Sequence, residues 1–249
     1  MHGSVIRFAM IALLLLSQTI KADTILGVYL SATSWQPEFD GNIESLGPSI
    51  DLNQNLGLED DSSNQFSIRL EHPIPGLPNF GTQTNTLDTT AGVVLNQDIS
   101  FDGTAFLQGT DLQSTIDLSH QDIILYYEVL DNWVSLDLGI NLMLFDGDIT
   151  LLSDNQSAFV ELDEVIPSLY AMLQFEFPKT GMYIGAIASY IGLDDNHFTK
   201  TKLQLGWESD SGLGAELGYQ SFAAEWTDYD NSNGNLNYDG YYASITYHF

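Results

Sequence analysis

The chain ends with YYASITYHF, residues 241–249, in which apolar and polar side chains alternate. Successive side chains of a β-strand point to opposite faces, so every second residue shares a face. One face of this strand would carry Tyr241, Ala243, Ile245, Tyr247 and Phe249, and the other Tyr242, Ser244, Thr246 and His248. The first face needs an apolar environment. Either the interior of a soluble sandwich or the hydrocarbon of a membrane would supply it.

The first 22 residues have the three parts of an export signal. Arg7 supplies a positive charge, residues 8–16 form an unbroken apolar run, and Ala22 completes a cleavage site. The apolar run is too short to span a bilayer as a stable helix. We therefore expect residues 1–22 to be a cleaved signal peptide and residues 23–249 to form the exported domain.

The composition excludes several classes of function. The chain has no cysteine, which removes disulfide frameworks and thiol catalysis. Its formal net charge is −28, and the basic residues beyond the signal are Arg69, Lys179, Lys200 and Lys202. Nucleic-acid binding requires a basic surface, so we expect no nucleic-acid partner, and no motif indicates a cofactor. The acidity suits a cation-rich setting with divalent cations as partners, and solubility alone explains it equally well.

The alternation is clearest in the middle of the chain. Between residues 134 and 144 every second residue is apolar, and Asp137 and Asn141 lie among the residues between them. A helix would place these two polar residues beside the leucines, so the pattern predicts a strand. Similar segments recur, separated by Gly, Asp, Asn and Pro clusters, and no later run is long enough for a membrane helix. A chain of this kind could span a bilayer only as a closed barrel.

Short and long connections alternate between the predicted strands. Short turns are predicted near residues 73–79, 130–132, 178–181 and 209–212. Longer polar loops are predicted near residues 37–61, 97–111, 153–157, 194–197 and 228–237. This alternation is typical of outer-membrane barrels, in which the short turns face the periplasm. We predict an all-β, antiparallel, up-and-down transmembrane β-barrel of about ten strands, with eight or twelve strands as alternatives.

One predicted strand, residues 112–129, changes parity along its length. Ile116 and Leu118 fall on the opposite face from Ile123 and Leu125. Either a bulge lies near residues 119–121, or the first half of the strand stands above the membrane, where the facing matters less.

The two ends of the exported domain resemble a family of uncharacterised outer-membrane β-barrel proteins of Gram-negative bacteria. The opening DTILGVY, residues 23–29, followed by Trp35 and Gln36, looks like the mature N terminus of that family. The resemblance implies the cell outer membrane as location, with lipid and lipopolysaccharide as surroundings. It also implies that the barrel-assembly machinery recognises the last strand through Tyr241, Ile245, Tyr247 and Phe249. The family carries no assigned reaction, so nothing follows about catalysis.

Charged residues of the predicted strands fall on the faces opposite the apolar ones. The predicted inward charges are Arg69, Glu71, Glu128, Asp137, Glu176, Lys202, Glu208 and Glu216. A barrel of about ten strands is narrow, since aqueous channels are typical of roughly 16–18 strands. We expect a hydrogen-bonded network in the lumen, with Arg69 and Lys202 beside acids, because unpaired buried charges are costly. A narrow cation-selective pore is the alternative.

Two acidic loops are weak candidates for a metal site. Asp228 and Asp230 open a run that resembles a calcium loop, but its glycine, Gly234, is seventh rather than sixth, and no glutamate follows at the twelfth position. Asp194 and Asp195 precede His197 in a second loop. A solvated hairpin loop is the default interpretation of both runs.

The histidines allow a further interpretation, an outer-membrane hydrolase. His197 beside Asp194 and Asp195, or His120 between Asp117 and Asp122, could act as the water-activating base of a protease. A lipase would need a serine–histidine pair, and no serine is clearly matched to a histidine in the sequence. We therefore predict a non-catalytic structural or surface-interaction role with acidic extracellular loops. A small cation-preferring channel is the first alternative, and a protease or lipase the second.

Overall fold

The computed structural model describes residues 26–59, 61–193, 196–229 and 232–249 of the chain. The predicted signal peptide and three of the loop acids, Asp194, Asp195 and Asp230, lie outside these residues. Among the described residues, no helix has the length and apolar character needed to cross a bilayer.

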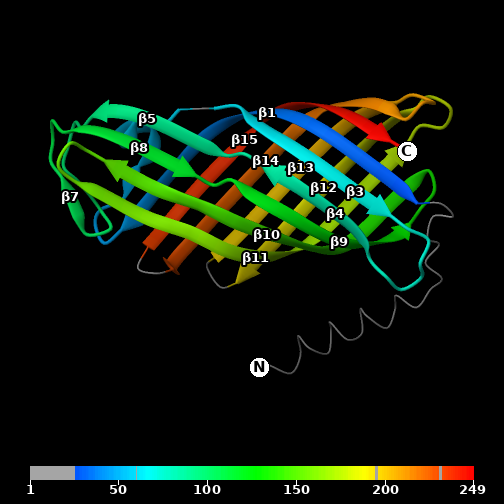
Figure 1. The fold of residues 1–249 in the computed structure, drawn as a ribbon, viewed down its shortest axis with the longest axis horizontal. Coiled ribbons are helices and arrows are strands. Elements are labelled where there is room, and N and C mark those ends of the chain that lie inside the picture. Colours follow the sequence, from blue (N-terminus) through cyan, green and yellow to red (C-terminus); the bar gives the residue numbers. More distant parts are fainter. Residues whose placement is uncertain (1–25, 60, 194–195, 230–231) are drawn as a thin grey trace, which may run out of the picture.

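Ten antiparallel strands close into a barrel, which confirms the predicted fold class and strand number (Figure 1). In spatial order they are β11 (Ser157–Glu176), β12 (Met182–Leu193), β13 (Asn196–Glu208), β14 (Leu213–Tyr229), β15 (Ser232–His248), β1 (Gly27–Ser45), β3 (Ser63–Glu71), β4 (Asn79–Asn85), β9 (His120–Leu130) and β10 (Val134–Leu152). The sheet closes where β10 pairs with β11. The last strand pairs with the first, and Val28 and Phe249 exchange two backbone hydrogen bonds of 2.8 and 3.0 Å.

The apolar faces of the strands point away from the barrel axis. Tyr241, Ile245 and Phe249 are 76%, 66% and 62% exposed, whereas Tyr242 and Ser244 between them are buried. The other strands add to a continuous apolar belt, which includes Leu30, Phe66, Leu138, Ile140, Leu169, Leu173, Ile184, Leu203, Leu205 and Leu217. A soluble sandwich would bury these side chains in a shared interior, so the structure excludes the sandwich interpretation.

The belt covers only one half of the barrel, the half nearest the short turns and the C terminus. We call this end of the barrel the turn end. Its short turns lie at the positions that the sequence predicts, at residues 72–78, 131–133, 177–181 and 209–212. In β1 the outward residues change from Leu30 and Ala32 near the turn end to Glu38, Asp40 and Glu44 farther along the strand. The strands therefore continue well beyond the apolar belt.

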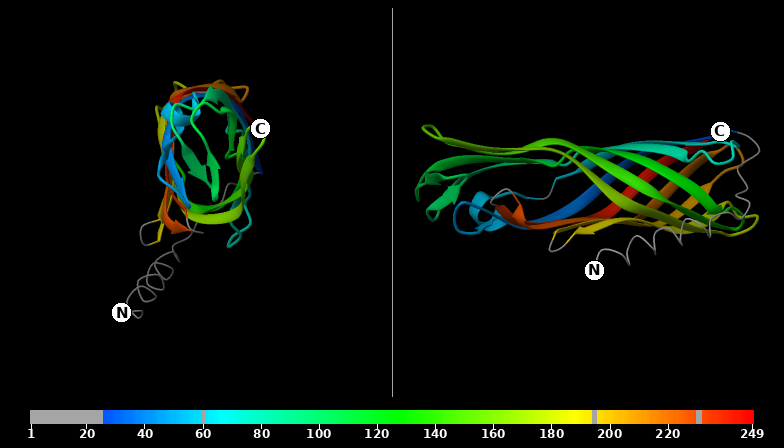
Figure 2. Two further views of the ribbon diagram at one scale, coloured as in Figure 1. Left: turned by 90° about the vertical axis from the view of Figure 1, so that its left-hand side faces the viewer. Right: turned by 90° about the horizontal axis from the view of Figure 1, so that it is seen from below.

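The continuation forms a second, compact part that we call the head. It comprises residues 35–59, 87–118, 143–166, 222–229 and 232–238. Besides the barrel strands it contains β2 (Ile50–Asp51), α2 (Leu52–Leu56), β5 (Asp88–Val94), β6 (Ile99–Phe101), β7 (Thr104–Phe106) and β8 (Asp111–Asp117). Figure 2 shows β5 and β8 lying over the far end of the barrel, opposite the end of β1 and α2. Apolar side chains fill the space between them, including Trp35, Phe39, Ile43, Leu52, Leu56, Phe106, Ile116, Ile149, Leu151, Phe222 and Leu236.

Two predicted polar loops contain continuations of barrel strands. Within residues 37–61, β1 continues to Ser45 because Phe39 and Ile43 point into the head core while the acids between them face solvent. Within residues 228–237, β14 runs to Tyr229 and β15 begins at Ser232, and Leu236 is buried in the same core. Both loop predictions were wrong because each segment has polar residues on its outward face, and its inward apolar residues alternate over only a few positions.

The parity change in the predicted strand 112–129 is not a bulge, because the segment keeps one register against β10, with Asp117 opposite Asp148 and His120 opposite Phe145. The segment divides into β8 and β9, with Leu118 and Ser119 between them, and β8 lies in the head. In the same way β4 and β5 follow one another with only residues 86–87 between them. The second of the two explanations therefore holds: the first half of the segment lies in the head, where Ile116 and Leu118 face the core.

Candidate functional site: the lumen cavity

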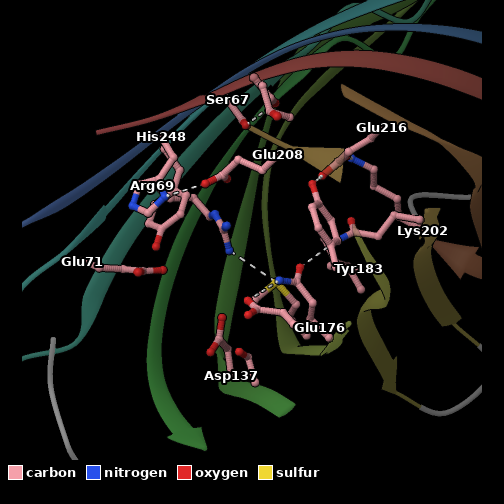
Figure 3. Close-up of a pocket in the computed structure, with 18 of the residues that line it drawn as sticks. Ser67, Arg69, Glu71, Asp137, Glu176, Tyr183, Lys202, Glu208, Glu216 and His248 are labelled. Atoms are coloured by element: carbon pink, nitrogen blue, oxygen red, sulfur yellow. Dashed lines mark hydrogen bonds and ion pairs between the residues drawn. The ribbon is translucent and has the colours of Figure 1, made fainter. Parts of the chain in front are cut away.

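A polar cavity of about 560 Å³ occupies the barrel interior between the head core and the turn end (Figure 3). Residues of two turns, including Lys179 and Asp210, line its mouth. All eight residues that the sequence places on inward faces line it as well: Arg69, Glu71, Glu128, Asp137, Glu176, Lys202, Glu208 and Glu216. The alternation of each strand brings them together, because every second side chain faces the axis.

One side of the cavity holds an ion pair. Lys202 Nζ lies 3.1 Å from Glu216 Oε2, and Lys202 also lies 4.3 Å above the ring of Tyr242. The hydroxyl of Tyr183 donates to Glu216 Oε1 at 2.8 Å. In Figure 3 these groups from β12, β13 and β14 point toward one another. Lys202 therefore lies beside an acid, as the sequence predicts.

Arg69 has different surroundings. Its Nη1 donates to Met172 Sδ at 3.3 Å, and its guanidinium lies 4.8 Å from the centre of the Tyr29 ring. Among the described residues no carboxylate lies within ion-pair distance of Arg69. The expected pairing of Arg69 with an acid is therefore absent as a direct contact.

Neutral donors satisfy several of the acids around the cavity. The Tyr126 hydroxyl donates to Glu71 Oε1 at 2.9 Å, and Asn79 Nδ2 donates to Glu128 Oε2 at 3.2 Å. Gln174 Nε2 donates to Glu176 Oε1 at 3.4 Å. Glu208 Oε1 lies 3.4 Å from His248 Nδ1. These contacts orient the carboxylates, but most of them add no positive charge.

A second cluster lies deeper, where the cavity meets the head core. Lys200 Nζ forms a short ion pair with Asp122 and lies 3.2 Å from His120 Nε2. The other oxygen of Asp122 accepts from Asn141 Nδ2 at 2.9 Å, and Asn85 Nδ2 also donates to Asp122, at 3.0 Å. Neither Asp122 nor Lys200 is among the inward charges predicted from the sequence. The signal was present, since Asp122 shares parity with Glu128, and Lys200 with Lys202.

The histidines proposed for a hydrolase lie apart from one another. His120 is buried, with Nδ1 2.8 Å from the carbonyl oxygen of Leu118, and its ring packs against Phe145 and Phe222. Asp117 is not its partner, because Asp117 Oδ1 accepts from the backbone N–H of Ser119. His197 lies in the exposed part of β13, 3.3 Å from Glu225.

The metal candidates fall at strand ends. Asp228 is near the end of β14, where its backbone N–H donates to Asn233 Oδ1 at 2.8 Å, and Gly234 lies within β15. Asp230, Asp194 and Asp195 lie outside the described residues. Within the described part of the chain, no group of three or more His, Cys, Asp or Glu is arranged to hold a metal ion.

Known structures share the overall fold. The sequence matches no protein-family model and no curated protein. Similar solved structures include the outer membrane protease OmpT from Escherichia coli, with 8% identity, a TM-score of 0.54, and coverage of 94% of this chain and 100% of OmpT. They also include the transport unit of the autotransporter AIDA-I from Escherichia coli, with 12% identity, a TM-score of 0.43, and coverage of 98% and 97%. The match to OmpT and the closure of the ten-stranded sheet show that the chain has the closed antiparallel β-barrel fold of outer-membrane proteins.

Proposed function

We propose that the protein is a non-catalytic outer-membrane barrel that presents its acidic head at the cell surface. The proposal includes export through a cleaved signal at residues 1–22 and recognition of Tyr241, Ile245, Tyr247 and Phe249 by the barrel-assembly machinery. The orientation follows from the turns, because outer-membrane barrels keep their short turns in the periplasm. The lumen cavity then opens to the periplasm and the head faces outward.

One observation carries the structural role: an apolar core fills the barrel above the cavity. Four large side chains are almost completely buried in this core: Trp35, Phe106, Ile116 and Leu151. A channel through the barrel would need a polar path past them. A packed apolar interior has few voids larger than a water molecule. A barrel closed in this way supports a surface head rather than a conduit.

The outer wall of the head favours cationic surroundings. Asp88, Asp117, Asp148 and Glu161 lie opposite one another on four adjacent strands. Like charges directly opposite each other destabilise a sheet. Divalent cations, which also bridge the phosphates of lipopolysaccharide, would offset this repulsion, and we propose both as surroundings of the head.

A small cation-preferring channel is the second candidate. Nine carboxylates line the cavity against four lysine and arginine side chains, which favours cations over anions. Conduction would require the head core to open.

Planar-bilayer recording of the folded protein separates the two functions. We expect no unitary conductance steps at any applied voltage, with insertion verified by the heat-dependent gel mobility of the folded barrel. Discrete, cation-selective steps would overturn the structural proposal and establish the channel.

A further inference from the structure

Three side chains that line the cavity each carry a buried oxygen atom with no hydrogen-bond partner in the described protein. The atoms are Asp137 Oδ2, Asn141 Oδ1 and Gln220 Oε1. The residues that carry them are 1%, 1% and 3% exposed. Buried polar atoms without partners are rare in folded proteins. An ionised carboxylate and the two amide oxygens accept hydrogen bonds, so a partner for these atoms has to be a donor.

The charge around the cavity indicates the sign of that partner. Asp122 and Glu216 have lysine partners, and Glu208 contacts His248. The contacts of Glu71, Glu128 and Glu176 come from neutral hydroxyl or amide groups. The carboxylates lining the cavity therefore outnumber the cations that could neutralise them, and an anionic ligand would add to the repulsion. The unpartnered acceptors require a hydrogen-bond donor, and the excess negative charge favours a donor that is positively charged.

The arrangement favours an organic cation over a metal ion. The unpartnered oxygens lie on β10 and β14, and no described group of acids and histidines converges as metal ligands do. The cavity volume of about 560 Å³ falls within the range of sites for small molecules, roughly 300–1,000 Å³. Asp137 is near the turn end of β10, and Asn141 is four residues deeper on the same face. The acceptors are therefore spread along the cavity rather than gathered at one point.

We propose that the lumen cavity binds a small organic cation with two or more ammonium or guanidinium donors. The ligand enters at the turn end, because the head core closes the opposite end. Asp137 meets one cationic group, and Asn141 and Gln220 accept hydrogen bonds from the remainder. Binding of this kind does not depend on the surface role of the head, so the two proposals can fail separately.

Calorimetric titration of the mature chain, folded in detergent micelles, tests the site with putrescine as the probe. We expect saturable binding that Asp137→Asn weakens about tenfold or more, because a charge-assisted hydrogen bond is lost. The matched control is Asp146→Asn, an exposed acid on the outer face of the same strand, which should bind like the wild type. Gln220→Leu provides a second variant should Asp137→Asn not fold, and it should also weaken binding.

Three results would overturn the proposal. The first is no saturable binding of putrescine by the folded wild type. The second is equal binding by the wild type and the cavity variants. The third is equally tight binding of succinate, a dianion of similar length, or displacement of putrescine by an equimolar amount of Mg²⁺.

Discussion

Asp122 and Lys200 form the most deeply buried ion pair of the described chain. This pair allows the contribution of a single interaction to the stability of the barrel to be tested. Asp122 accepts from Asn85 and Asn141 as well as from Lys200, so the carboxylate is fully surrounded. Removing one member of a buried pair leaves the other charge without compensation.

We predict that Lys200→Met destabilises the barrel by about 3–5 kcal/mol, because Asp122 remains charged and buried. The double variant Asp122→Asn/Lys200→Met should recover part of this loss, because neither charge remains. Urea unfolding in detergent micelles measures both. Lys179→Met, which removes an exposed lysine in the turn at residues 177–181, is the control. A Lys200→Met variant as stable as this control would show that the pair contributes nothing.

The inward placement of both residues could be predicted from strand parity, but their pairing could not. Asp122 is on β9 and Lys200 is on β13, two strands that are not neighbours in the sheet. Contact across a barrel depends on strand tilt and on the stagger of the closed sheet, which no local pattern specifies. For the same reason, the lack of a direct acidic partner for Arg69 could not be anticipated.

The far half of β1 shows how an element can be hidden in a sequence. After Pro37, three outward residues, Glu38, Asp40 and Asn42, make the segment look like a polar loop. Its inward residues alternate over only a few positions, with Phe39, Gly41 and Ile43 facing the head core. A strand is predicted from sequence most readily where the alternation is long. The long alternation of β10 therefore predicted a strand, whereas the short one in the far half of β1 did not.

We predict that Phe39→Ala lowers the free energy of unfolding by about 3–5 kcal/mol, because a buried aromatic side chain is replaced by a cavity. Its neighbour Glu38 faces solvent, so Glu38→Ala should change stability by no more than about 0.5 kcal/mol. Thermal unfolding of the two variants, followed by circular dichroism, makes the comparison. Equal stabilities would mean that residues 37–45 behave as the loop that the sequence suggested.

The same alternation of apolar and polar residues faces opposite ways in the two halves of the barrel. Near the turn end the apolar face points outward to the belt and the polar face lines the cavity. In the head the same chain places apolar residues inside and acids outside. The lower half could be predicted because long strands repeat its pattern. The filled head could not, because its core is assembled from short segments such as β6, β7 and α2.

The absence of cysteine allows single cysteines to be placed along β15 and labelled with a nitroxide in liposomes. Oxygen, which partitions into lipid, and a water-soluble nickel complex would then report the surroundings of each position. We predict that labels at residues 241, 243, 245 and 247 are accessible to oxygen and that those at 242, 244 and 246 are not. The label at 237 should respond to the nickel complex. Labels at 241, 243, 245 and 247 that respond to the nickel complex and are inaccessible to oxygen would contradict the outward placement of the apolar faces, and with it the membrane-spanning barrel.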